Sequence, residues 1–157
     1  MSRIIIAHRG NIDGPLKAEE NKPKYIDAAL ENGFDVEVDL WLENGHFLLG
    51  HDSGQFQIND DFLLERSANL WCHAKNIDAL YHLSNMPLNY FWHETDAYTL
   101  TSKNYIWAYP EKQVCENSIC VMPENNDPNF ELTRPLCCAG FCTDWPKVLR
   151  DLLNETS

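Results

Sequence analysis

Four short polar clusters in the first third of the chain carry side chains that could do chemistry together. They are His8-Arg9-Gly10, Glu20-Asn21, Glu37-Val38-Asp39 and His51-Asp52. Carboxylates at positions i and i+2 of a strand lie on one side, about 7 Å apart, and burying both is costly unless a cation bridges them. The sequence therefore predicts one divalent cation, Mg²⁺ or Ca²⁺, which both prefer oxygen ligands. Two histidines beside it suit paired acid–base chemistry, because imidazole titrates near neutral pH.

The segments between these clusters predict the elements that must position them. Residues 3–7 form a β-branched apolar run, which is typical of a strand buried on both faces. A helix is expected from Pro23 to the Gly33 stop, followed by a strand over 34–42. Strand, helix and strand imply parallel pairing. Asn44-Gly45 then predicts a hairpin whose return strand, 46–49, delivers the last cluster to the same neighbourhood.

Beyond the hairpin the pattern predicts strands with few helices between them. The expected strands cover 70–75, 90–93, 105–109, 118–122 and 136–143, and the expected helices cover 76–85 and 146–153. A full eightfold β/α barrel usually needs about 250 residues, and the chain has 157. We therefore expect one domain over residues 1–157 with an α/β fold. It would be a compact, helix-depleted TIM-barrel-like (β/α) fold, closed or nearly closed, with a hairpin after the second strand.

The composition excludes several classes of partner. The formal charge is −12, from 12 basic and 24 acidic residues, so the surface should repel nucleic acid and anionic membranes. No apolar run approaches the roughly 20 residues that span a bilayer, and the first residues lack the pattern of a signal peptide. These features predict a cytoplasmic protein without stable membrane association. Six cysteines without a CxxC pair are expected to be reduced.

The order and spacing of the clusters resemble a known family. The first 52 residues are similar to the N-terminal half of the glycerophosphodiester phosphodiesterases, which belong to the phosphatidylinositol-phospholipase-C-like barrels. The resemblance includes the Ala-Leu-x-x-Gly helix end at Ala29, the hairpin Asn44-Gly45, and the terminal Thr143-Asp144-Trp145-Pro146. It favours a shared polar site over the alternative that Glu37 and Asp39 form an exposed face of an edge strand.

The resemblance implies a role for each matched residue. Glu37 and Asp39 would hold the cation, and His8 and His51 would be the general acid and base. Phosphate contacts would come from Arg9 and Lys75, and supporting positions are Glu20, Asn21 and Asp52. The family's third strand carries Glu-x-Lys, where this chain has His73-Ala74-Lys75. His73 would then replace a carboxylate ligand, and imidazole makes Mn²⁺ or Zn²⁺ possible as well.

Further candidates have two interpretations each. His93 could belong to the site or lie on its rim, and Trp107 could bind substrate or pack the barrel. Glu124 and Asp144, which also follow predicted strands, are lesser candidates. 

The implied function is hydrolysis of a small soluble glycerophosphodiester-like substrate, as in lipid metabolism. The alternatives are a catalytically weak or inactive phosphate- or metal-binding module on the same barrel, and a phospholipase-D-like lyase. A homodimer is possible if strand edges are exposed.

Overall fold

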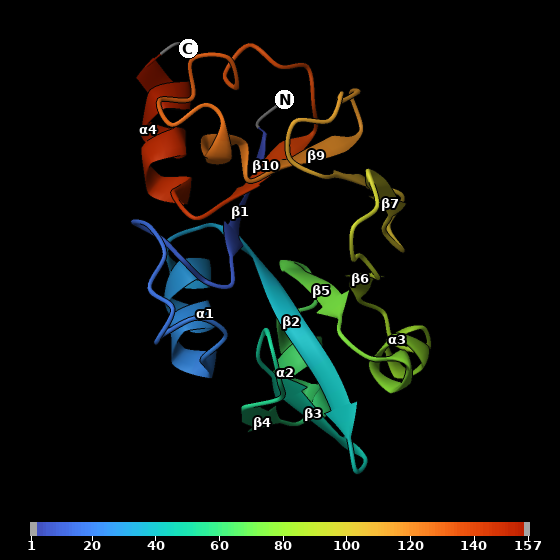
Figure 1. Ribbon diagram of the computed structural model, residues 1–157. Helices are drawn as coiled ribbons and strands as arrows, with labels where there is room; N and C mark the ends of the chain where they lie inside the picture. Colours follow the sequence, from blue (N-terminus) through green and yellow to red (C-terminus); the bar gives the residue numbers. More distant parts are fainter. Residues whose placement is uncertain (1–2, 156–157) are drawn as a thin grey trace.

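A single curled sheet of ten strands forms the frame of the protein (Figure 1). The computed structural model describes residues 3–155. The strands are β1 (Ile4–His8), β2 (Asp35–Glu43), β3 (His46–Leu49), β4 (Phe56–Ile58), β5 (Leu70–Ala74), β6 (Asn89–Phe91), β7 (Tyr98–Leu100), β8 (Ile106–Ala108), β9 (Ser118–Val121) and β10 (Gly140–Thr143). The helices are α1 (Pro23–Glu31), α2 (Asp60–Glu65), α3 (Ile77–Leu83) and α4 (Pro146–Glu155), with a 3₁₀ turn, η1, at Pro123–Asn125.

Parallel pairing brings the carboxyl ends of the central strands to one mouth. The parallel ladder runs β6–β5–β2–β1–β10–β9–β8. The hairpin strands β3 and β4 extend antiparallel from β2, and β7 pairs antiparallel with β8. This order confirms a helix-depleted α/β fold with a hairpin after the second strand.

The expected closed or nearly closed barrel is wrong, because the sheet forms a curled half-barrel. Within residues 3–155 no ladder joins β6 to β7 or β8. The chain after β6 turns back as β7, antiparallel to β8, instead of crossing over as a helix. Isolated hydrogen bonds bridge the gap. Ser102 N donates to Tyr90 O at 2.9 Å, Tyr90 N donates to Ser102 Oγ at 3.0 Å, and Ser102 Oγ donates to Leu88 O at 2.9 Å. Thr99 Oγ1 donates to Trp92 O at 2.9 Å.

Local sequence signals explain the elements that flank the site. Pro23 opens α1, and Gly33 follows the helix with φ 82°, a conformation that glycine adopts without steric cost. The Asn76 side chain accepts from Ala79 N at 3.0 Å and caps α3. The strand expected over 136–143 is shorter than predicted and begins only at Gly140.

The inside of the curl is an aromatic and apolar layer below a polar mouth. Strands β1, β5, β6, β8, β9 and β10 contribute Ile6, Trp71, Phe91, Trp107, Ile119 and Cys142 to this layer. A second apolar cluster lies between the outer sheet face and the helices, where α1 and α3 pack against β2. All six cysteines are free, as expected. None of the helices in residues 3–155 is long and apolar enough to cross a membrane.

Candidate active site

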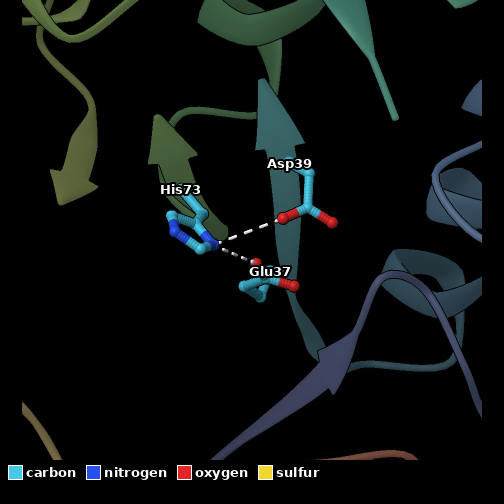
Figure 2. Close-up of side chains that lie close together, drawn as sticks. All are labelled: Glu37, Asp39 and His73. Atoms are coloured by element: carbon cyan, nitrogen blue, oxygen red, sulfur yellow. Dashed lines mark ion pairs between the residues drawn. The ribbon is translucent and has the colours of Figure 1, made fainter. Parts of the chain in front are cut away.

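Two acidic residues of β2 and a histidine of β5 meet at the mouth of the curl (Figure 2). Sheet register places Asp39 opposite His73. His73 Nδ1 lies 3.3 Å from Asp39 Oδ1 and 3.5 Å from Glu37 Oε1. Glu37 and Asp39 are 2% and 1% exposed, so the interpretation of an exposed edge-strand face is wrong. The three side chains form a cluster that could hold a metal ion.

The donor atoms of this cluster fit a small divalent cation. Asp39 Oδ1 is buried and, with His73 neutral, accepts no hydrogen bond. His73 Nε2 lies 2.8 Å from His93 O, to which it donates, so a neutral His73 presents its Nδ1 lone pair to the carboxylates. Adjacent ligands of an octahedral ion at about 2.1 Å lie about 3.0 Å apart. Here the imidazole nitrogen is 3.3 and 3.5 Å from the two carboxylates, and all three donor atoms lie within 4.8 Å of one another. Two carboxylates and one imidazole suit Mg²⁺ and Mn²⁺ better than a thiolate-preferring ion.

Without a cation, a proton on His73 balances the two acids. Burial lowers the pKa of His73, but the hydrogen bonds and charges of Asp39 and Glu37 outweigh burial and raise the pKa to about 9. The imidazolium and a metal ion therefore compete for one place, and cation binding must release this proton.

Polar groups behind Asp39 fix its orientation. Asn21 Nδ2 donates to Asp39 Oδ2 at 2.9 Å, and Asp39 N donates to Asn21 Oδ1 at 3.0 Å. Arg9 Nε lies 3.2 Å from Asp39 Oδ2, and Lys75 Nζ lies 3.8 Å from Oδ1. Burial alone would raise the pKa of Asp39, yet hydrogen bonds from His51 and His73 and the charge of Arg9 hold the pKa well below its usual value. Asp39 is therefore a carboxylate throughout the neutral range.

His8, at the end of β1, forms a dyad with Asp144. Its Nδ1 lies 2.8 Å from Asp144 Oδ1, and its Nε2 lies 4.0 Å from Glu37 Oε2. The bond to Asp144 keeps the proton on Nδ1 and leaves Nε2 as the atom that can exchange a proton at the mouth. Burial lowers the pKa of His8, but Asp144 and Glu37 outweigh it and raise the pKa.

Neutralising Asp144 should lower the pKa of His8. The carboxylate stabilises the imidazolium, so in Asp144→Asn we expect the His8 titration midpoint to fall by about one pH unit. NMR titration of the His8 ring in EDTA measures this shift. The matched control is Asp13→Asn, whose carboxylate is exposed and paired with Lys147. An unchanged midpoint in Asp144→Asn would contradict the dyad.

Arg9 is held by three partners rather than free to meet a ligand. It has a left-handed φ of 54°, and its Nη1 donates to Glu20 Oε2 at 3.1 Å. Its Nη2 lies 2.7 Å from His51 Nδ1. Arg9 Nη2 also lies 3.2 Å from His51 Nε2, and because a guanidinium can only donate, the ring nitrogen that accepts from it carries no proton. A phosphate that uses Arg9 must therefore share it with His51.

A cavity of about 400 Å³ joins these groups. Its lining includes the predicted site residues His8, Arg9, Glu37, His51, His73, Lys75, His93 and Trp107. The predicted supporting residues Glu20 and Asn21 lie behind this lining, on Arg9 and Asp39. Asp52 differs from them, because its side chain is 95% exposed and 3.7 Å from His51 Nε2. His93 contributes its backbone carbonyl as well as a lining ring.

Three residues contribute more than the sequence indicated. Asp144 was a lesser candidate, although the terminal Thr-Asp pair marked it. Glu124 Oε1 accepts from Asp144 N and from Thr143 Oγ1, both at 2.8 Å, and so holds the end of β10 in place. Asn11 was missed, and its Nδ2 donates to Asp144 Oδ1 at 2.9 Å and Glu20 Oε1 at 3.0 Å. No local pattern marks Asn11, since both partners are set by the fold.

Comparisons with known proteins add no assignment at this point. No model of a protein family, no curated protein and no solved structure matches the chain.

Proposed function

We propose that the protein is a metal-dependent phosphodiester hydrolase of the glycerophosphodiester phosphodiesterase type. Its substrate would be a small soluble diester. One observation carries the proposal: two histidines from different strand ends line the same cavity as the Glu37–Asp39–His73 cluster. This combination suits phosphodiester cleavage, in which a proton must leave the nucleophile and another must reach the departing alkoxide.

Different residues of the cavity would have different roles in the cleavage reaction. Arg9 and Lys75 are the cations on the lining, and they would orient the phosphate oxygens. Water attacks phosphorus, a new P–O bond forms, and the P–O bond to one alcohol breaks. One of His8 and His51 takes the proton of the water, and the other gives a proton to the departing alkoxide. A divalent cation on Glu37, Asp39 and His73 would neutralise charge on the phosphoryl oxygens when bound.

Cation-dependent turnover tests the proposal. We expect hydrolysis of bis(4-nitrophenyl) phosphate and of glycerophosphodiesters with Mg²⁺, Ca²⁺ or Mn²⁺, and loss of activity in EDTA that returns when the cation is restored. Phosphorus NMR identifies the product, because a monoester indicates water as the nucleophile and a cyclic phosphate indicates a lyase. Binding of phosphate or cation without turnover with any of these metal ions would overturn the proposed hydrolase activity and support a binding module.

A further inference from the structure

One wall of the active-site cavity is largely apolar, apart from the Tyr109 hydroxyl, the Trp107 ring N–H and the amide of the adjoining Asn125. It consists of Trp107, Tyr109, Pro110, Val121 and Met122, at and beyond the ends of β8 and β9. The sheet order separates β8 and β9 from β2 and β5, which carry the cation ligands. Because the sheet curls and both sets of strands line one cavity, this apolar wall lies across the mouth from the charged wall, which carries Arg9, Glu37, His73 and Lys75.

Ring contacts hold the apolar wall in place. Trp107 stacks on Phe91 with ring centroids 4.5 Å apart and lies 5.9 Å from Trp71. Trp107 is only 4% exposed and forms the base of the wall. Tyr109 lies 5.5 Å from the His93 ring and is 42% exposed, so part of its ring is free for contact. Met122 N donates to Cys142 O at 2.8 Å, which fixes the backbone at the rim. The wall therefore exists before any ligand binds.

A phosphodiester bound at the charged wall would have to place one alcohol on this wall. Arg9 and Lys75 fix where the phosphate lies, and the cavity holds about 400 Å³. Burying a ring or alkyl group against this apolar wall is favourable, because apolar surface leaves water. Burying the hydroxyls of a polyol there is unfavourable, because the hydroxyls lose water without gaining hydrogen-bond partners. This argument rests on the proposed function.

We infer that the site selects phosphodiesters in which one alcohol carries an aromatic or compact apolar group. Tyr109 and Met122 are the residues that would contact this group, above the Trp107 ring. The second alcohol would remain on the polar side of the mouth, where glycerol can be accommodated.

A matched pair of substrates tests the inference. Benzyl glyceryl phosphate and methyl glyceryl phosphate have departing alcohols of similar acidity, so their difference reports the apolar contact and not the chemistry. We expect the benzyl ester to have a kcat/KM about tenfold higher. In Tyr109→Ala this ratio should fall towards one. The matched control is Tyr98→Ala, because Tyr98 is exposed on β7 and does not line this cavity.

Binding of the same two esters, measured by calorimetry with Mn²⁺ present, separates the possible outcomes. Equal turnover and equal affinity for both esters would overturn the inference and leave the proposed function standing. Preferential binding of the benzyl ester without turnover would support the inference and overturn the hydrolase. Absence of both binding and turnover would overturn both. A ratio that falls equally in Tyr98→Ala would show that Tyr109 does not form the subsite.

Discussion

Replacing His8 with alanine is expected to lower kcat/KM for phosphodiester hydrolysis by about 10²–10⁴-fold, the usual contribution of a positioned acid or base. The reason is geometric. Asp144 Oδ1, 2.8 Å from His8 Nδ1, orients the imidazole so that Nε2 faces the mouth of the cavity. Asp144 cannot take over this position when the imidazole is removed. The measurement is initial-rate kinetics on bis(4-nitrophenyl) phosphate at saturating cation.

His46→Ala is the matched control for this variant, since His46 is exposed on β3 and does not line the cavity. It should retain native kinetics. The cation affinity of His8→Ala should also stay close to the native value, because His8 is outside the Glu37–Asp39–His73 cluster. A His8→Ala variant with near-native kcat/KM would rule out His8 as the proton-transfer group.

Glu37→Gln is expected to weaken divalent cation binding by more than the roughly 10–100-fold that loss of an outer partner costs. The amide keeps the shape of the side chain but removes the charge that attracts the ion. Calorimetric titration with Mn²⁺ measures the affinity. The native protein should also gain about 2.7 kcal/mol of unfolding free energy at a cation concentration of 100 times Kd, and the variant should gain much less.

Glu43→Gln provides the control for lost charge alone. Glu43 ends the same strand but is exposed and lies outside the cluster. It should bind the cation as the native chain does. In EDTA, Glu37→Gln should lower the pKa of His73, because one of the two carboxylates that raise this pKa has been neutralised. Native cation affinity in Glu37→Gln would exclude Glu37 as a ligand.

The parts of the fold that could be predicted are those with strong local signals. β1 is a β-branched run, α1 lies between Pro23 and Gly33, and Asn44-Gly45 fixes the β2–β3 turn. The spacing of Glu37 and Asp39 predicted the acidic pair, whereas His73 was assigned through the family resemblance, and the register places it opposite Asp39 on the next parallel strand.

The opening of the barrel could not be predicted, because it depends on pairing between distant short segments. β4 and β7 have three residues each and α2 has six, too few for a hydrophobic period to emerge. The antiparallel return of β7 onto β8 is decided by contacts that no local window contains. A barrel expected from strand count alone was therefore too complete.

The charge network of the site was only partly predictable for the same reason. Arg9 was expected to face phosphate, and the structure places it on the cavity lining but pairs it with Glu20, Asp39 and His51. The Asp144 dyad joins residues that are 136 positions apart. Trp107 was given two interpretations, and it both packs in the core and lines the cavity.

The claim on which the account depends is that Glu37, Asp39 and His73 bind one divalent cation at the mouth of the curled sheet. Pulsed electron paramagnetic resonance of the native protein with Mn²⁺ tests it directly, because the spectrum reports nitrogen bound to the metal. We predict one bound ion coupled to a single imidazole nitrogen, with the coupling absent in His73→Glu. No bound Mn²⁺, or a bound ion without nitrogen coupling, would contradict the account.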